Sequence, residues 1–314
     1  MASKFLIVIG GPTAIGKTDI AIQLAKDLNT VILSADSRQV YKELNIAVAK
    51  PTEQQLSEVK HYFISHKSIL EDYSAYDYQK DVHQLLPELF KKHNYVIMVG
   101  GTGFYINAVL NGLNEIPAIS EETKEKVENL YKEKGIEFLQ QELKEKDFEY
   151  YQKVDLNNPV RIMRALEVIY ETNRPFSDFL NDKLIKKPDY FVPVKIWLNT
   201  RRQDLYDRID ERVQKMIENG LEYEARKLYY YRHLHALNTV GYKEWWRFFE
   251  TRQLTKESVV EQIKRNTRQY SKRQITWFRH QFEGKEIELS FQNSFEENYL
   301  MVKKEVEAEL EQMV

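Results

Sequence analysis

The 314-residue sequence contains no cysteine. Disulfide bonds and metal sites built from thiolates are therefore excluded, and the composition is compatible with a reducing compartment. The 7 histidines show no His-x-x-x-His pair or other spacing typical of metal ligands. These absences argue against a small secreted domain held by disulfides and against an enzyme that depends on a histidine-bound metal.

Long apolar runs are also missing. No run approaches the ~20 residues that a membrane helix needs, and the apolar run after Lys4 leads directly into a glycine-rich motif. We therefore expect a cytoplasmic protein without a signal peptide or a membrane partner; we also expect a monomer. With 42% apolar and 30% charged residues, the composition is that of a globular protein with one large domain or two smaller ones.

The sequence also lacks a strong excess of positive or negative charge. The net charge is −2, so the protein as a whole does not attract polyanions. If RNA is a partner, local cationic patches must bind it.

Four short apolar runs, separated by helical periodicity, indicate a fold of the α/β class. Apolar residues repeat with helical spacing after Gly16 and again between residues 104 and 110. Because strands that alternate with helices favour a parallel arrangement, we predict a parallel sheet. The predicted strands are residues 5–9, 31–33, 95–99 and 191–198.

The middle of the chain shows helical patterning and no convincing strand from Ser120 to about Lys187. Ser120 and the pair Asn158–Pro159 are typical helix starts. We therefore predict a helical insertion within a catalytic core. The insertion is predicted at residues 119–188, and the core at residues 1–118 and 189–314.

The last third of the chain is predicted to be helical. One helix begins near Arg202 and ends at Gly220, in the position where a left-handed residue commonly closes a helix. A longer helix is expected from about Thr255 to Gln281.

Residues 11–18 match the pattern G-x-x-x-x-G-K-[ST]. They follow a predicted strand and open a predicted helix, which is the context in which this pattern binds phosphate. Backbone N–H groups turn toward the anion, Lys17 adds a point charge, and Thr18 offers a hydroxyl to Mg²⁺. A glycine-rich turn without a ligand is the alternative. The candidate diphosphate ligands are Gly11, Pro12, Thr13, Ala14, Ile15, Gly16, Lys17 and Thr18.

This loop predicts a diphosphate group in the ligand but does not identify the molecule that carries it. Motors driven by ATP usually end another core strand in an acidic residue that helps to hold Mg²⁺. Here the strand at 95–99 runs into Gly100-Gly101-Thr102, and only the segment from Val31 to Asp36 leads from a strand to a carboxylate. The motor interpretation is thereby weakened, whereas a small-molecule kinase and a transferase that uses another diphosphate both remain open.

With Asp36-Ser37-Arg38-Gln39-Val40-Tyr41, the sequence resembles the tRNA dimethylallyltransferases, also called tRNA isopentenyltransferases or IPP transferases. The P-loop spelled Gly-Pro-Thr-Ala-x-Gly-Lys-Thr supports the resemblance, and the blocks run in order from residue 11 to 279. The further blocks are Ala49-Lys50-Pro51, Tyr73-Ser74, Gly100-Gly101-Thr102-Gly103-Phe104-Tyr105, Arg161-Ile162-Met163-Arg164-Ala165-Leu166-Glu167-Val168, Val240-Gly241-Tyr242 and Arg273-Gln274-Ile275-Thr276-Trp277-Phe278-Arg279.

The resemblance implies that N6 of adenine 37, the base beside the tRNA anticodon, attacks dimethylallyl diphosphate. It also implies a P-loop-like core with a helical insertion that grips the RNA. One departure is visible, because Ala47 and Val48 stand where the family usually has glycine and threonine. This departure concerns local contacts of the loop from Ile46 to Pro51 rather than the chemistry.

Transfer of an allylic group requires cations at the leaving diphosphate and a base at the amine. Lys17 and an arginine suit the first task. The resemblance favours Arg212, with Arg208 one turn away as second choice; a surface salt bridge is the alternative for either. Asp36, just past a strand end, is the candidate base, with a turn or cap role as the alternative from the residues alone. The resemblance favours catalysis and places the Thr102 hydroxyl near the same amine.

A base must leave its stack to react, and single-stranded loops are recognised by stacking and base-edge contacts. Ser37, Arg38 and Gln39 lie beside Asp36 and are candidates for contacts with neighbouring bases. The resemblance marks further positions for tRNA contact, which are Lys124, Val160, Arg161, Ile162, Met163, Arg164, Asn238, Thr239, Val240, Gly241, Tyr242 and Lys243.

The segment from residue 264 to 279 contains 6 cations and no acid. Lys264, Arg268 and Lys272 recur every four residues and therefore share one helix face. We predict that this face follows the phosphate backbone of tRNA, while the interleaved aromatic residues pack into the core.

Other functions remain compatible with the same motifs. A nucleoside or nucleotide kinase would share the P-loop and Asp36. An adenylate prenyltransferase would use the free nucleotide, although the long helical insertion favours a macromolecular acceptor. A non-catalytic RNA-binding protein could retain an inactive P-loop, but Lys17, Thr18 and Asp36 are all intact.

Overall fold

The computed structural model describes residues 3–180, 188–251 and 253–313. The chain divides into two compact units, one formed by residues 1–110 and 188–314 and the other by residues 111–187. The sequence suggests boundaries at 118/119 and 188/189, and the predicted end of helical patterning at Lys187 lies outside the described residues. Within the described ranges, no helix is long and apolar enough to cross a membrane.

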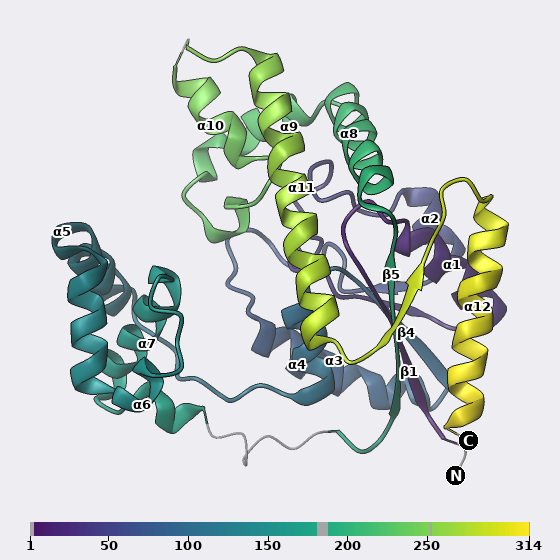
Figure 1. Cartoon of the computed structure of the whole chain (residues 1–314), viewed down its shortest axis with the longest axis horizontal. Coiled ribbons are helices and arrows are strands. Elements are labelled where there is room, and N and C mark those ends of the chain that lie inside the picture. The colour runs from purple at the N-terminus through teal and green to yellow at the C-terminus, as the bar shows by residue number, and fades with distance from the viewer. Residues whose placement is uncertain (1–2, 181–187, 252, 314) are drawn as a thin grey trace. The chain divides into compact units, whose positions relative to one another are not determined.

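A parallel sheet forms the centre of the first unit (Figure 1). Its six strands lie in the order β3 (His61–Tyr62), β2 (Ile32–Ser34), β4 (Tyr95–Val99), β1 (Phe5–Gly10), β5 (Val192–Asn199) and β6 (Lys285–Glu288). Every pairing is parallel, so the predicted parallel sheet is confirmed. β1 lies between β4 and β5, and its continuous apolar run is therefore buried along its whole length.

The two edge strands are not predicted from the sequence. β3 has two residues, and β6 reads Lys-Glu-Ile-Glu, in which only Ile287 is buried. The expectation that the last third of the chain is helical is therefore wrong for residues 285–288. These residues form a strand because β5 offers them a backbone partner, not because of their own composition.

Helices surround this sheet and extend beyond it. The helices of the first unit are α1 (Lys17–Asp27), α2 (Glu53–Glu58), α3 (Ala75–Phe90), α4 (Gly103–Asn111), α8 (Arg202–Glu218), α9 (Leu221–Leu228), α10 (Lys243–Glu250), α11 (Lys256–Gln281) and α12 (Phe295–Gln312), with the short turns η3 (Tyr229–Tyr231) and η4 (His235–Leu237). Figure 1 shows α8, α9 and α10 beyond the end of the sheet at which β5 leads into α8. Gly220, with φ 93°, separates α8 from α9, as predicted for a helix end.

The second unit is helical, as predicted. It contains α5 (Glu121–Lys146), α6 (Phe148–Tyr151), α7 (Pro159–Thr172) and the turn η1 (Phe176–Phe179). Ser120 caps α5 and Asn158 caps α7 with their side chains, which confirms both predicted starts. Gly135 interrupts α5 with a φ of 78°, a break that the sequence analysis does not anticipate. The core of this unit includes Val127, Leu143 and Leu166.

α11 is attached to the P-loop by one side chain. Gln274 is 7% exposed; its Oε1 accepts a hydrogen bond from the N–H of Thr13 (2.9 Å), and its Nε2 donates to the carbonyl oxygen of Gly101 (2.8 Å). One turn later, Phe278 stacks on Trp197 of β5 with ring centroids 5.8 Å apart. The helix therefore joins the loops that follow β1 and β4 at the carboxyl end of the sheet.

Gln274→Ala should lower the free energy of unfolding by about 2 kcal/mol, because it leaves a buried backbone donor and a buried acceptor without partners. Urea denaturation measures the change. Gln269→Ala, an exposed change on the same helix, is the control and should stay within about 0.5 kcal/mol of wild type. Equal stabilities for the two variants would contradict the structural role of Gln274.

Candidate active site

The P-loop between β1 and α1 has a backbone that restricts which residues fit. Gly11 has φ 141°, and a Cβ atom there would lie 2.6 Å from the carbonyl oxygen of Leu198, so glycine is required. Ala14 adopts a positive φ of 66°. Such alternating conformations turn successive N–H groups toward one side and suit an anion at the start of α1.

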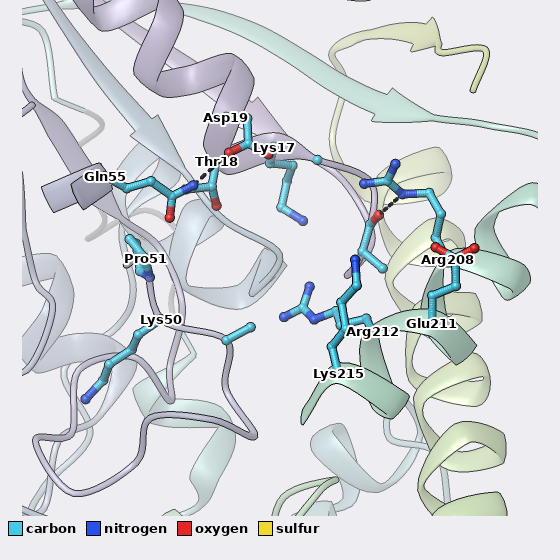
Figure 2. A pocket seen from close by; sticks show the side chains of 13 residues that line it. Lys17, Thr18, Asp19, Lys50, Pro51, Gln55, Arg208, Glu211, Arg212 and Lys215 are labelled. Atoms are coloured by element: carbon cyan, nitrogen blue, oxygen red, sulfur yellow. Dashed lines mark hydrogen bonds between the residues drawn. The ribbon is translucent and has the colours of Figure 1, made fainter. Parts of the chain in front are cut away.

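A cavity of about 350 Å³ lies beside this loop. Figure 2 shows Lys17 pointing into it, with Arg212 and Lys215 pointing into it from α8. The charged residues that line it are Lys17, Lys50, Arg208, Arg212, Lys215, Asp19 and Glu211. Because cations outnumber carboxylates there, an anion is the natural ligand.

The protein leaves much of this positive charge without a counter-ion. Lys17 donates a hydrogen bond to the carbonyl oxygen of Pro12 (2.6 Å). Burial and, to a smaller extent, nearby Arg212 lower the pKa of Lys17 to about 7, and Asp36 opposes the shift. Burial also lowers the pKa of Arg212, again against the influence of Asp36. An anion bound among these groups would favour their charged forms.

The two arginines of α8 that line this cavity differ in how they are held. Arg208 donates through Nε to the carbonyl oxygen of Ala14 (2.9 Å), and its guanidinium lies 4.2 Å from the ring centre of Phe291. Arg212 lines the same cavity, and in the described part of the chain it forms no hydrogen bond. Arg212 is therefore free to contact a diphosphate, whereas Arg208 is already committed to the P-loop.

A second, inner cavity of about 170 Å³ continues from the first, since Lys17, Thr18 and Arg212 line both. Its polar lining includes Ser34, Asp36, Arg38 and Gln39. Its apolar lining includes Ala47, Val48, Ile64, Ile209, Val213, Met216, Val240 and Ile263. A ligand with an anionic head in the first cavity would thus find both hydrocarbon and a carboxylate in the inner one.

Asp36 forms the turn contacts that one of its two sequence interpretations predicts, and one of its carboxylate oxygens stays open for the other. Its Oδ1 accepts hydrogen bonds from the N–H groups of Arg38 (2.9 Å) and Gln39 (3.3 Å), as a turn aspartate does. Oδ2 forms no hydrogen bond to a described residue and remains available as a proton acceptor. Thr102 lies beside it, because its hydroxyl accepts from the N–H of Ser37 (3.2 Å).

Tyr270 of α11 is a site residue that the sequence analysis misses. Its hydroxyl is hydrogen-bonded to Thr102, and the Arg273 guanidinium lies 5.8 Å from its ring centre. Burial of the hydroxyl and the nearby Asp36 raise the pKa of Tyr270 to about 12. From the sequence, Tyr270 is expected only to pack into the core, like the other aromatic residues between these cations. Helical periodicity does not show which loop a helix faces.

The loop from Ile46 to Pro51 forms one wall of the inner cavity and is held by two polar side chains. Gln39 donates to the carbonyl oxygens of Val48 (3.2 Å) and Ala49 (3.1 Å). The predicted base contact of Gln39 is therefore unsupported, since its amide group is occupied within the protein. Glu224 of α9 accepts from the N–H of Ile46 (2.9 Å).

The segment 238–243, which is predicted to contact tRNA, divides by burial. Thr239, Val240 and Gly241 line the inner cavity, and Lys243 is exposed. Tyr242 is fully buried and donates to Glu224 (2.5 Å), so its side chain is structural rather than a tRNA contact.

The predicted tRNA positions of the second unit also divide by burial. Val160 and Arg161 are exposed at the start of α7. Ile162 is fully buried in the core of that unit, so its side chain cannot meet RNA, and Met163 packs against the same core. Two of the cations predicted to contact tRNA are paired with acids: Arg164 with Glu167 (3.2 Å) and Lys124 with Glu121 (2.6 Å).

The cationic row predicted on α11 is not a free surface. Arg268 forms a two-pronged pair with Asp210 of α8, with Nε 3.0 Å from Oδ1. Lys264 pairs with Glu261 (2.7 Å), and its side chain is 19% exposed. Lys272 alone of the three is exposed. The expectation fails for Arg268 because the neutralising acid belongs to another helix, which inspection of α11 alone cannot reveal.

Comparison with known proteins agrees with this geometry. A family model described as IPP transferase matches residues 39–281. The chain is 48% identical over 283 residues to a tRNA dimethylallyltransferase of Flavobacterium psychrophilum and 47% identical over 278 residues to one of Christiangramia forsetii; each match covers 88% of this chain and 91% of the relative. A solved structure, a tRNA isopentenylpyrophosphate transferase from Bacillus halodurans, is similar with a TM-score of 0.68, 32% identity and 99% of both chains covered. The match extends over most of the chain, which belongs to the IPP transferase family.

Proposed function

We propose that this protein is a tRNA dimethylallyltransferase. It transfers the dimethylallyl group of dimethylallyl diphosphate to N6 of adenine 37, beside the anticodon, and forms N6-(dimethylallyl)adenosine and diphosphate. Relatives that are nearly half identical and bear this name support the reaction. The P-loop and the cavities beside it support the donor.

α8 carries the observation on which the donor assignment rests. One row of its side chains lines the cationic cavity. A second row lines the apolar side of the inner cavity, and each of its members directly follows a member of the first row in the sequence. The rows are Arg208, Arg212 and Lys215, and Ile209, Val213 and Met216. Residues three and four apart share a helix face, so one helix offers charge to a diphosphate and, beside it, hydrocarbon to the attached prenyl group.

The reaction needs one bond broken, one bond formed and one proton moved. C1 of the prenyl group loses its bond to a diphosphate oxygen and gains a bond to N6, while a proton of the amine passes to Asp36. Negative charge that develops on the leaving diphosphate is stabilised by the P-loop N–H groups, Lys17 and Arg212. The Thr102 hydroxyl, held by Tyr270, lies on the same side as the carboxylate and can orient the amine.

Mg²⁺ is the metal that suits this site. The described residues include no group of three or more His, Asp or Glu side chains that could hold a metal by themselves. Thr18 lines the cationic cavity, so an ion there would bind through its hydroxyl, water and diphosphate oxygens, which is the usual arrangement for Mg²⁺. When bound, such an ion adds positive charge at the leaving group.

The proposed acceptor is the anticodon stem-loop of tRNA. The proposed enzyme is a monomer that acts in the cytoplasm. Exposed cations suited to phosphate occur in both units, including Arg161 in one and Lys243, Arg265 and Lys272 in the other. These local charges can bind a polyanion although the net charge is −2.

The decisive experiment combines the protein with dimethylallyl diphosphate, Mg²⁺ and unmodified tRNA. Digestion of the tRNA should yield prenylated adenosine, identified by mass. Free adenosine monophosphate as acceptor should yield none. Steady ATP hydrolysis or phosphoryl transfer without any prenylation would overturn the proposal in favour of a kinase.

Asp36→Asn should slow prenyl transfer by about 10²–10⁴-fold and leave tRNA affinity within a few fold of wild type. The amide oxygen can still accept from the Arg38 and Gln39 N–H groups, so the turn is kept while the proton acceptor is lost. Single-turnover rates and tRNA binding are measured separately. Asp207→Asn, which changes an exposed carboxylate outside both cavities, is the control, and an unimpaired Asp36→Asn enzyme would refute the assignment.

Binding of a non-reactive prenyl diphosphate analogue should take up most of one proton at about pH 8 and little at about pH 6. The pKa of Lys17 is about 7 in the free protein, so the amine is largely neutral at the higher pH and is protonated when the anion binds. Calorimetry in buffers of different ionisation enthalpy measures the uptake. The uptake should disappear in Lys17→Met; its persistence there would assign the proton to another group.

Lys272→Ala should reduce the slope of log affinity against log salt for tRNA by roughly 0.7–0.9, the value for one lost phosphate contact. Arg268→Ala should leave this slope unchanged, because Asp210 already neutralises the guanidinium. Binding titrations at several salt concentrations provide the slopes, with donor affinity as the control. If Lys272→Ala and wild type give parallel lines, Lys272 is merely solvated.

A further inference from the structure

An outer groove adjoins the inner cavity, and Asp36 lines only the inner cavity. The volume of the groove is about 510 Å³, and its apolar lining includes Ile46 and Leu56. Residues that line both spaces are Ala49, Pro51, Ile64, Arg212 and Met216. Among these shared residues, Ile64 and Met216 have large uncharged side chains. They therefore form the apolar part of the partition between the two spaces.

The apolar row of α8 leads from the diphosphate site to this partition. Arg212 lines the cationic cavity. The next residue, Val213, lines the inner cavity, and so does Met216, which lies about one helical turn further along. A donor whose diphosphate lies against Arg212 would extend its hydrocarbon along Val213 toward Met216. The inner cavity, of about 170 Å³, must also admit the attacking amine beside Asp36. The five-carbon group and the amine must therefore share this space.

We propose that Met216, together with Ile64, limits the length of the prenyl donor to five carbons. This inference rests on the proposed prenyl transfer and identifies what restricts its donor. The Met216 side chain closes the inner cavity behind the dimethylallyl group. Its removal joins the inner cavity to the outer groove, where Ile46 and Leu56 can receive a second isoprene unit.

The reaction itself is unchanged with a ten-carbon donor. C1 leaves the diphosphate oxygen and bonds to N6, the proton passes to Asp36, and diphosphate departs. Only the hydrocarbon beyond the first isoprene unit needs a new place. In wild type that unit would have to displace packed side chains, which is unfavourable even when the side chain is a flexible methionine.

Met216→Ala should raise the ratio of kcat/KM for geranyl diphosphate to kcat/KM for dimethylallyl diphosphate by tenfold or more, since one methylene in an apolar pocket already changes specificity by about 10–200-fold. Prenylated tRNA is measured by mass with each donor. Ile64→Ala should act in the same direction. Met216→Val, a smaller change at a half-buried position, should give an intermediate ratio and provides a test if the alanine variant folds poorly.

Leu56→Ala is the matched control. Leu56 lines only the outer groove and is 37% exposed, so its truncation enlarges that groove without opening the partition and should leave the ratio at its wild-type value. If the variants transfer the five-carbon group but gain nothing with the ten-carbon donor, or if Leu56→Ala gains equally, the partition role is overturned. If wild type transfers no prenyl group at all, the proposed function fails instead.

Discussion

Positive charge that the protein does not neutralise dominates the active site. Burial lowers the pKa values of Lys17 and Arg212, and Asp36 acts against the shift in both cases. That carboxylate supplies one negative charge against the two cations that it influences. The proposed diphosphate would complete the site, because it would supply the missing negative charge beside the P-loop N–H groups and α8. Charge that develops on the leaving group meets groups that are already in place.

The positions of these groups depend on contacts between helices and loops rather than on the P-loop alone. Arg208 attaches α8 to the carbonyl oxygen of Ala14, and Gln274 attaches α11 to Thr13 and Gly101. The pair between Arg268 and Asp210 then joins the two helices. Through this framework, the cationic and apolar rows of α8 lie at a fixed distance from the carboxyl ends of β2 and β4, where Asp36 and Thr102 follow. The separation between the cationic cavity and Asp36 is thus set by packing.

The wall of the inner cavity formed by residues 46–51 shows how a departure from the family pattern is tolerated. Glu224 satisfies the backbone N–H of Ile46 and also accepts from Tyr242, so the loop is held by its backbone. A Cβ atom at Gly241 would lie 2.8 Å from the Cβ of Ala47. The absence of a side chain at Gly241 therefore makes room for Ala47, at a position where the resemblance implies glycine.

Features that depend only on residues close together in the sequence can be predicted from the sequence by itself. The P-loop, the buried strands β1 and β4, and the side-chain caps Ser120 and Asn158 all arise from local spacing, burial and backbone preference, and each is found where it is predicted. The parallel sheet follows from their alternation with helices.

The partners of polar side chains that reach another part of the chain were decided only by the tertiary structure. Gln39 and Arg268 resemble RNA contacts in the sequence, yet they bind the 46–51 loop and α8. Tyr270 resembles a core aromatic, yet its hydroxyl meets Thr102. Helical spacing shows which residues share a face, but which face meets a ligand depends on elements far apart in the chain. The rows of α8 are visible in the sequence as helical spacing, whereas the two cavities that they line exist only in the tertiary structure.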